Sequence, residues 1–369
     1  MGKAGGLLGW LPLAGSLCIA IGYAIIVAYI LKALVDSVAG TLMSADTASW
    51  FGSFSSSDFS VVPYHVIVVV GTLLTLYLGA HSIEKTNKIM MPTFFLIFLV
   101  LAVRVAFLPG SSEGYKFMFT PRWEALKDPM IWIWAMGQAF FSLSIGIGTM
   151  VTYASYFKAD TNLRHTALSV TLLDSLVAIL AGVVIFPAVF SVGIAPESGP
   201  SLVFITLPGI FNTMPLSMVW SSIFFLLLVV AALTSTISLH EVLTVYFSEE
   251  WHLSRRAAAW TTTLSTAVLA ALASLSLGAL SGYPIFGKNL FDGLDFLTAN
   301  ILLPLGGLAT SLFVGWHLDK RVIRREMTND GSLRFRIFGL FLFLLRYVCP
   351  AVLCLIFLDN LGLLKVFFT

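Results

Sequence analysis

Nine runs of about twenty apolar residues limit what this chain can fold into. They fall at residues 7–34, 63–80, 88–108, 129–156, 165–191, 217–247, 256–278, 294–317 and 335–358. Such a run crosses the hydrocarbon core of a bilayer as a helix, which satisfies its own backbone N–H and C=O groups. Hydrophobic residues make up 58% of the chain and charged residues only 11%, which excludes a soluble globular protein. The sequence predicts a single-domain, all-α integral membrane protein with nine spans.

The basic residues between the runs indicate how the chain is oriented. If the N-terminus is cytoplasmic, thirteen Lys and Arg residues lie on the cytoplasmic side and five on the other. The positive-inside rule therefore predicts a multi-pass protein of the cell inner membrane, with a cytoplasmic N-terminus and the C-terminus outside. No basic, aromatic-interleaved patch suggests a nucleic-acid partner. The three cysteines, Cys18, Cys349 and Cys354, lie inside apolar runs and predict neither a disulfide framework nor a metal cluster.

The run at residues 131–156, IWIWAMGQAFFSLSIGIGTMVTYASY, is long enough to span a membrane, yet its middle is rich in small and polar residues. These are Gly137, Ser142, Ser144, Gly146 and Gly148. An interrupted membrane helix is tolerated only where the freed backbone groups face protein or a watery cavity. In secondary transporters, such broken helices carry substrates and coupling ions. We expect a binding site at this break. The string SIGIG also loosely resembles a potassium-channel filter, but its membrane-length flanks argue against one.

A second unusual run, 217–247, carries hydroxyl groups along one helical stripe. Ala231 and Ser235 are four residues apart, as are Thr234 and Ser238, so these residues share a face. Small hydroxyl residues often serve helix packing and bond their own i−4 carbonyls. The alternative is a site for a hard cation such as Na⁺, built from hydroxyl and carbonyl oxygens. The nearby string HEVLT lacks the second histidine of a zinc-protease helix, so it predicts no zinc site.

Asp174 stands inside the run at 165–191. A carboxylate there costs about 2.5–3.5 kcal/mol on insertion scales, so an acid within a span is a functional candidate by default. One interpretation is a protonated acid that bonds to a neighbouring helix. The interpretation that we favour is a fixed negative charge beside a bound cation, because the broken run and the hydroxyl stripe also suggest cations.

Several strings together resemble the neurotransmitter:sodium symporter family in a bacterial form. They are GQAFFSLSIGIG with TYASY, ALTSTIS, IEKTNKIMMP, SGPSLVFITLP and DFLTANILLPLGG, and the resemblance covers nearly the whole chain. It implies a LeuT-type bundle of two inverted five-helix repeats followed by extra helices. The nine runs resemble the family's helices three to eleven. Residues 7–108 would then be the remainder of the first repeat, 129–317 the second repeat, and 335–358 an extra helix.

The family's first two helices have no counterpart before Met1, so we expect a chain that is truncated at its N-terminus. The resemblance implies a sodium-coupled symporter of amino acids that works by alternating access, with Na⁺ as the co-transported ion and no organic cofactor. No covalent catalysis, and hence no enzyme activity, is expected. The alternative is a truncated, non-transporting membrane remnant or partner protein. Its expected partners are the small-molecule substrate, Na⁺ and the lipid bilayer, and the sequence makes no prediction of oligomeric state.

The resemblance also implies roles for particular residues. Ser142 and Asp174 match the first sodium site. Ala231, through its carbonyl, and the hydroxyls of Thr234 and Ser235 match the second. Tyr23 matches the tyrosine that holds the substrate carboxylate, and Phe141 the aromatic residue that covers the substrate. The remaining pocket residues would be Ile19, Ser144, Ile147, Ser235 and Leu239, whose mostly apolar character favours a hydrophobic amino acid.

Two further expectations follow from the same resemblance. Chloride-dependent members have an asparagine where this chain has Asp174, and a serine four residues later, where it has Ala178. Both differences predict independence from chloride. Asp295 matches an acid of the extracellular gate and Glu249 an acid of the cytoplasmic gate.

Overall fold

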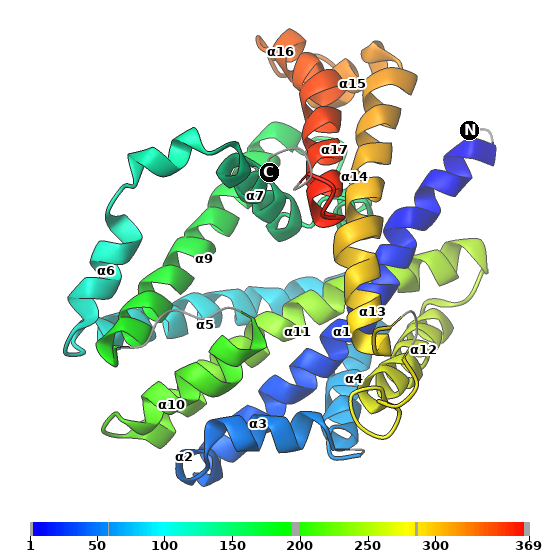
Figure 1. The fold of residues 1–369 in the computed structure, drawn as a ribbon. Coiled ribbons are helices and arrows are strands. Elements are labelled where there is room, and N and C mark those ends of the chain that lie inside the picture. Colours follow the sequence, from blue (N-terminus) through cyan, green and yellow to red (C-terminus); the bar gives the residue numbers. More distant parts are fainter. Residues whose placement is uncertain (1–2, 58, 194–198, 285–286, 365–369) are drawn as a thin grey trace. The chain divides into compact units, whose positions relative to one another are not determined.

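The structure is a computed structural model that describes residues 3–57, 59–193, 199–284 and 287–364, and the elements in these ranges are helices. The chain divides into two compact units, which we describe separately. Unit 1 consists of residues 1–19, 122–176 and 294–369, and unit 2 of residues 20–121 and 177–293. Helices α1 (Lys3–Val38), α9 (Leu163–Ser191) and α13 (Leu290–Phe296) contribute residues to both units. Figure 1 shows the course of the chain.

Unit 1 contains the start of α1, the first half of α9 and the end of α13. Its other elements are η1 (Trp123–Lys127), α7 (Pro129–Ser142), α8 (Gly148–Ser155), η3 (Leu297–Leu302), α14 (Leu303–Leu312), η4 (Phe313–His317), α15 (Lys320–Met327), α16 (Phe338–Phe343), η5 (Leu344–Val348) and α17 (Cys349–Asn360). The segments η3, η4 and η5 are π-helical, and η1 is a 3₁₀ turn. Within this unit α14 packs against α17, and α7 also contacts α17 (Figure 1).

Unit 2 contains the remainder of α1, the second half of α9 and most of α13. Its other elements are α2 (Thr41–Ser44), α3 (Thr47–Ser55), α4 (Val62–Tyr77), α5 (Ala80–Ala106), α6 (Ser111–Phe119), the π-helical segment η2 (Leu202–Thr206), α10 (Leu207–Asn212), α11 (Ser217–Glu250) and α12 (Arg255–Leu275). Helix α11 is its centre and packs against α4, α5 and α12. Its core includes the fully buried side chains of Ile25, Phe204, Phe225 and Leu227.

Seven helices of the described residues are long and apolar enough to cross a membrane. They are Gly9–Val38, His81–Ala106, Leu163–Ser191, Ser217–Glu250, Arg255–Leu275, Leu290–His317 and Phe338–Asn360. The protein is therefore a multi-pass membrane protein, and by length and composition the described residues support seven spans where the sequence predicted nine. The helix formed by the run at 63–80, α4, has only 16 residues, or about 24 Å at the usual rise, which is short for a bilayer core. The run at 129–156 is divided between α7 and α8.

Local sequence explains where several helices begin. Asp128 caps α7, because its carboxylate accepts a hydrogen bond from the Met130 backbone N–H at 2.9 Å, and Pro129 occupies the first helical position. Ser254 caps α12 in the same way through the Ala257 N–H. Pro12 lies inside α1, where the Ser16 hydroxyl donates to the Pro12 carbonyl at 2.9 Å. This is the i−4 back-bonding by which a hydroxyl group satisfies its own hydrogen-bonding needs inside an apolar helix.

The outward faces of the long helices are apolar. Leu96, Leu99 and Val103 of α5 are 62%, 59% and 52% exposed. Contiguous apolar surface of this kind is rare on a soluble monomer and suits contact with lipid tails. The exposed faces therefore agree with the membrane assignment that the lengths of the helices support.

Candidate functional site

The predicted break is present in unit 1, between α7 and α8. Helix α7 ends at Ser142 and α8 begins at Gly148, with a turn between them. Ser144 and Gly146 adopt left-handed backbone conformations, with φ of 54° and 89°. Such values interrupt a right-handed helix, and only glycine adopts them without strain. The clustering of Gly and Ser in this run therefore marked a real interruption.

Glycines allow this break to pack directly on α14. A Cβ atom built on Gly146 would lie 2.3 Å from the Leu303 carbonyl oxygen, and one on Gly306 would lie 2.6 Å from the Gly146 carbonyl oxygen. A Cβ on Gly307 would lie 2.6 Å from the ring of Phe140. The paired glycines of α14 thus leave room for the turn and for the last residues of α7. The sequence analysis assigned no role to this glycine pair, although adjacent small residues in a membrane helix indicate close packing.

Ser142 and Asp174 meet within unit 1, although 32 residues separate them in the sequence. The Ser142 hydroxyl donates toward both carboxylate oxygens, at 2.6 and 2.7 Å. Ser142 is the last residue of α7, so the acid lies at the C-terminal end of a half-helix. Both the carboxylate and a helix C-terminus carry negative charge or partial charge. The structure therefore brings together the two residues predicted for the first sodium site, in a place that favours a cation.

The hydroxyl stripe lies on α11, in unit 2. The Thr234 hydroxyl donates to the Ala231 carbonyl at 2.7 Å, and the Ser235 hydroxyl is 3.5 Å from the same oxygen. Ser238 bonds the Thr234 carbonyl at 3.0 Å. The three residues predicted for the second sodium site therefore present three oxygens close together. These contacts also match ordinary i−3 and i−4 back-bonding, which was the alternative interpretation of the stripe.

Tyr23 joins this group through a side-chain hydrogen bond with Ser235. Tyr23 belongs to α1 and Ser235 to α11, and both lie in unit 2. A phenol within a membrane span needs such a polar partner. Leu239, one turn beyond Ser235 on α11, is 6% exposed. Two of the residues predicted to surround the substrate, Tyr23 and Ser235, are therefore in contact, and a third lies one turn further along the same helix.

The other predicted pocket residues belong to unit 1. Ile147 is 7% exposed and lies directly before α8, while Ser144 stands in the turn itself. Ile19 of α1 is half-buried. Phe141, in contrast, is 56% exposed and lines a cavity beside α7.

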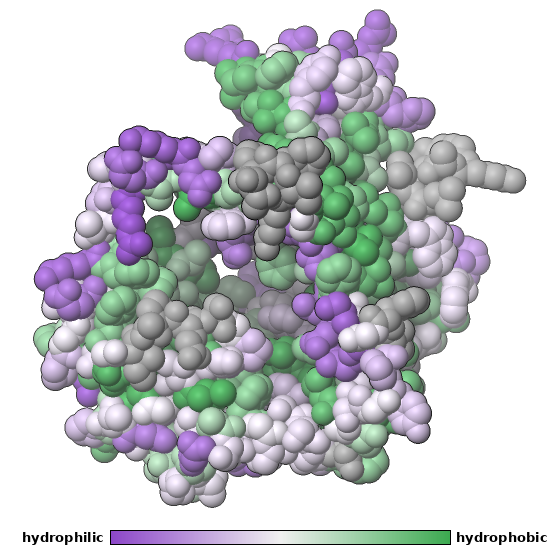
Figure 2. All heavy atoms as spheres, viewed as in Figure 1, coloured by the Kyte–Doolittle hydropathy of each residue, from purple (hydrophilic) through white to green (hydrophobic). Residues whose placement is uncertain are grey.

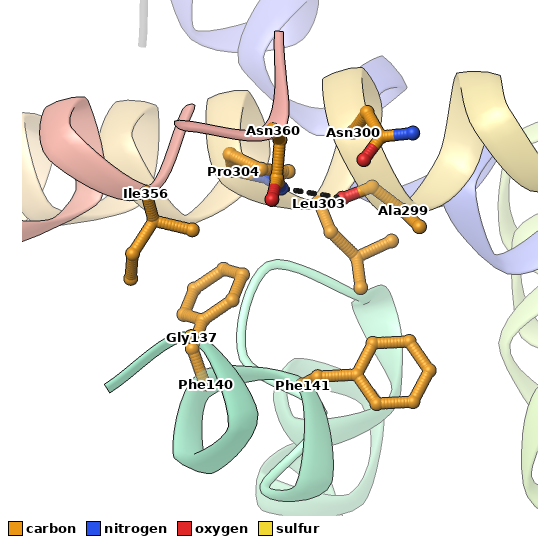
Figure 3. Close-up of a pocket in the computed structure, with 9 residues that line it drawn as sticks. All are labelled: Gly137, Phe140, Phe141, Ala299, Asn300, Leu303, Pro304, Ile356 and Asn360. Atoms are coloured by element: carbon orange, nitrogen blue, oxygen red, sulfur yellow. Dashed lines mark hydrogen bonds between the residues drawn. The ribbon is translucent and has the colours of Figure 1, made fainter. Parts of the chain in front are cut away.

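The cavity beside α7 has a volume of about 150 Å³. It is lined by Gly137, Phe140, Phe141, Ala299, Asn300, Leu303, Pro304, Ile356 and Asn360, which come from α7, the η3–α14 helix and α17. Figure 3 shows the Phe140 and Phe141 rings on one side of it and Asn360 on the other, with the Asn360 amide donating to the Ala299 carbonyl at 3.3 Å. Its lining is mostly apolar, and it lies directly beside the half-helix that ends at Ser142.

The predicted gate residues lie at the surface. Glu249 is exposed in the last turn of α11, in unit 2, and Asp295 is exposed on α13, in unit 1. Their roles as gates stay predictions.

Sequence reasoning missed a buried ion pair in unit 2. Glu241 of α11 is fully buried, and its Oε1 accepts from Arg255 Nη1 at 2.8 Å, while its Oε2 bonds Nη2 of the same side chain. Arg255 Nε also donates to the Leu76 carbonyl at 3.2 Å. The pair therefore ties α11, α12 and α4 together. Its signal in the sequence was a lone acid near the end of an apolar run and an arginine just after it.

These helices and the break define a multi-pass membrane protein with the interrupted helix of a secondary transporter. Residues 53–366 match the model of the Sodium:neurotransmitter symporter family. The chain belongs to this family.

Individual relatives agree with this assignment. The chain is 33% identical over 363 residues to the uncharacterized sodium-dependent transporter YhdH of Bacillus subtilis, covering 97% of this chain and 80% of the relative. A second uncharacterized sodium-dependent transporter, from Haemophilus influenzae, is 31% identical, with coverage of 96% and 79%. The crystal structure of MhsT in complex with L-phenylalanine matches with a TM-score of 0.85 and 36% identity, covering 97% of this chain and 82% of MhsT.

Proposed function

We propose that this chain is a sodium-coupled symporter of hydrophobic amino acids that works by alternating access. The contact between Ser142 and Asp174 at the end of α7 is the observation that carries the proposal. An acid within a membrane span is costly to insert, so its presence there indicates a function. Its negative charge next to a broken helix suits a coupling cation. The membership of the family and the names of its sodium-dependent relatives support Na⁺ as that cation.

In this proposal, Ser142 and Asp174 hold the first sodium ion. Hard cations prefer oxygen ligands, and the carboxylate supplies both an oxygen and a full negative charge. On binding, the ion takes the place of the Ser142 proton as the partner of the carboxylate, and the hydroxyl rotates to offer its own lone pair. The half-helix end at Ser142 adds to the negative potential.

The second sodium ion is held by the Ala231 carbonyl and the hydroxyls of Thr234 and Ser235. The hydroxyl oxygens of Thr234 and Ser235 lie 2.7 and 3.5 Å from the Ala231 carbonyl oxygen. These short distances support a compact group of neutral ligands. The Ser235 hydroxyl is shared with Tyr23, which is proposed to hold the substrate carboxylate. A substrate on Tyr23 and an ion on Ser235 would then influence one another, which is a physical basis for reciprocal coupling.

A hydrophobic amino acid is the proposed substrate. The residues assigned to its side chain are mostly apolar: Ile19, Ser144, Ile147, Ser235 and Leu239, with Phe141 as the covering ring. MhsT, whose crystal structure contains L-phenylalanine, supports this class of substrate. Phe141 is exposed and would have to turn toward the substrate to cover it.

Independence from chloride rests on the charge of Asp174. If a carboxylate is fixed beside the first sodium ion, no chloride is needed there to balance charge. Ala178 lies one turn after Asp174 and offers no hydroxyl to an anion. Both residues support a chloride-independent cycle.

Orientation and gating complete the proposal. The excess of basic residues on one side supports an inner-membrane protein with its N-terminus in the cytoplasm and its C-terminus outside. Glu249 would then serve a cytoplasmic gate and Asp295 an extracellular one. The division into repeats at 7–108 and 129–317, with an extra helix at 335–358, stays a prediction.

Reconstitution of the 369-residue chain tests the function directly. Proteoliposomes with an inward Na⁺ gradient should accumulate labelled phenylalanine or leucine, and replacement of external Na⁺ by choline should abolish the uptake. Equal uptake with choline would contradict sodium coupling. If the folded chain shows neither uptake nor Na⁺-dependent binding of any amino acid, it is the non-transporting remnant or partner protein instead.

A further inference from the structure

Cationic side chains gather at one end of unit 1, around α15 and the turn that follows it. The exposed ones are Lys320, Arg321, Arg324, Arg325, Arg334 and Arg336, and Arg164 at the start of α9 lies next to them. Figure 2 shows hydrophilic residues over this end, beyond the apolar surface of α14 and α17. A basic end above an apolar band is where a membrane protein meets the charged headgroups of lipids.

Most of this positive charge forms no ion pair within the part of the chain that the structure describes. Arg325 is the exception, because it lies 3.8 Å from Glu326 and 3.3 Å from Asp330. Within residues 3–57, 59–193, 199–284 and 287–364, no carboxylate forms an ion pair with Arg164 or Arg324. These two side chains therefore retain their charge for an external anion.

Aromatic rings hold both guanidinium groups in place. The Cζ atom of Arg164 lies 5.0 Å from the centroid of the Phe335 ring, and that of Arg324 lies 5.8 Å from the centroid of Phe338. The two ring centroids are 6.0 Å apart, and Phe341 contacts both rings. A guanidinium that stacks on a ring keeps the N–H donors along its edge free for bidentate binding of phosphate.

The environment of Arg164 favours the binding of an anion. Its Nε atom is buried and has no hydrogen-bond partner among the described residues. Arg164 as a whole is half-buried. A partly desolvated cation without a counter-charge is costly, and the cost falls when an anion binds the outward edge of the same group. This distinguishes Arg164 from the freely solvated arginines of α15.

The neighbouring surface is suited to lipid. Trp316 and Tyr347 are 55% and 52% exposed and meet edge to face at 5.4 Å, as in the aromatic belts at membrane interfaces. Ile337 and Leu340, beside the arginine cluster, are 61% and 55% exposed. A ligand at this position would therefore meet both cationic and apolar groups.

We propose that Arg164 and Arg324, held by Phe335 and Phe338, bind the phosphodiester of an anionic phospholipid such as phosphatidylglycerol. The headgroup phosphate would meet the guanidinium edges, and the glycerol and upper acyl chain would lie along Ile337 and Leu340. A zwitterionic lipid fits less well, because its own cation would face the unbalanced arginines. This site requires only that the protein spans a membrane, and is independent of the transported substrate.

Native mass spectrometry of the full chain in neutral detergent tests the site. Titration with dioleoyl phosphatidylglycerol should give tighter binding than titration with dioleoyl phosphatidylcholine. Arg164→Gln and Arg324→Gln should each weaken phosphatidylglycerol binding about fivefold, the usual effect of one basic residue at an anionic surface. Arg325→Gln is the matched control: it removes the same charge from the same helix, but a charge already paired with Asp330, and should change the affinity less than about twofold.

Three outcomes would overturn the proposal. Equal binding of the two lipids would exclude recognition of the anionic headgroup. If Arg325→Gln weakened phosphatidylglycerol binding as much as Arg164→Gln and Arg324→Gln, general charge attraction and no defined site would be indicated. Competition by inorganic phosphate at the same concentration as the lipid would indicate a site for free phosphate. If Arg164→Gln does not fold, the exposed Arg324→Gln decides alone.

Discussion

The Ser142 hydroxyl donates to the Asp174 carboxylate, at 2.6 and 2.7 Å to its two oxygens. This contact joins the end of a half-helix to an acid that stands in the middle of a membrane-spanning helix. A single hydroxyl proton leaves most of the carboxylate's lone pairs unused. The remaining lone pairs are available to the sodium ion proposed for this position, so Asp174 is the most informative residue to change.

Asp174→Asn should raise the Na⁺ concentration for half-maximal uptake by about tenfold or more, because a charged oxygen ligand is replaced by a neutral one. Sodium titration of phenylalanine uptake in proteoliposomes measures this. Glu326→Gln, an exposed acid of the same unit, is the control and should leave the titration unchanged. An unaltered Na⁺ dependence in Asp174→Asn would remove this residue from the first sodium site.

Ser235→Ala should weaken the binding of both Na⁺ and substrate, since the hydroxyl lies near the Ala231 carbonyl and bonds Tyr23. We expect each affinity to fall roughly five- to tenfold, which is about the contribution of one hydrogen bond. Thr236→Val is a suitable control, because Thr236 is buried and only bonds back to Ala232. If Ser235→Ala retained the normal Na⁺ affinity, the assignment of the second sodium site would be wrong.

Chloride should have no role in the cycle. Replacement of chloride by gluconate on both sides of the membrane should leave the rate of uptake unchanged within about twofold, because the Asp174 carboxylate already supplies the negative charge. Loss of most uptake in gluconate would refute this explanation for Asp174 and Ala178.

Gly146→Ala should destabilise the fold. The residue has a φ of 89°, and its new Cβ would lie 2.3 Å from the Leu303 carbonyl oxygen, so we expect a cost of about 2 kcal/mol or more. The melting temperature in detergent, followed by tryptophan fluorescence, measures this. Gly71→Ala is the matched control, because it lies inside α4 with nothing within 4 Å of the added atom. Equal melting temperatures for the two variants would contradict the close packing of the break on α14.

Glu241→Ala should leave Arg255 without its buried partner and cost about 3–5 kcal/mol. The double variant Glu241→Leu with Arg255→Met should recover much of this loss, since neither charge then remains to be solvated. Thermal unfolding of the two variants and of the unchanged chain provides the comparison. If the double variant is less stable than Glu241→Ala, the ion pair must stabilise the fold by more than the mutual neutralisation of its two charges.

The sequence alone predicted the parts of this protein that depend on neighbours along the chain. An apolar run of sufficient length in a membrane must become a helix, and the glycines and serines of 137–148 had to interrupt one of them. The spacing of Ala231, Thr234 and Ser235 places them within one turn of α11 without any tertiary contact. The apolar runs numbered nine, but only seven of the described helices are long and apolar enough to cross by themselves, because an apolar run does not reveal where a helix is short or interrupted.

Only the tertiary structure decided which distant residues meet. The contact of Ser142 with Asp174, the approach of Gly146 to Leu303 and the pairing of Glu241 with Arg255 each join segments that helical periodicity does not relate. These contacts depend on how helix faces rotate and pack, which depends on the shapes of all the side chains between them. The break at 137–148 and the acid Asp174 were thus both readable from the sequence, whereas the direct contact of Asp174 with Ser142 is seen only in the fold.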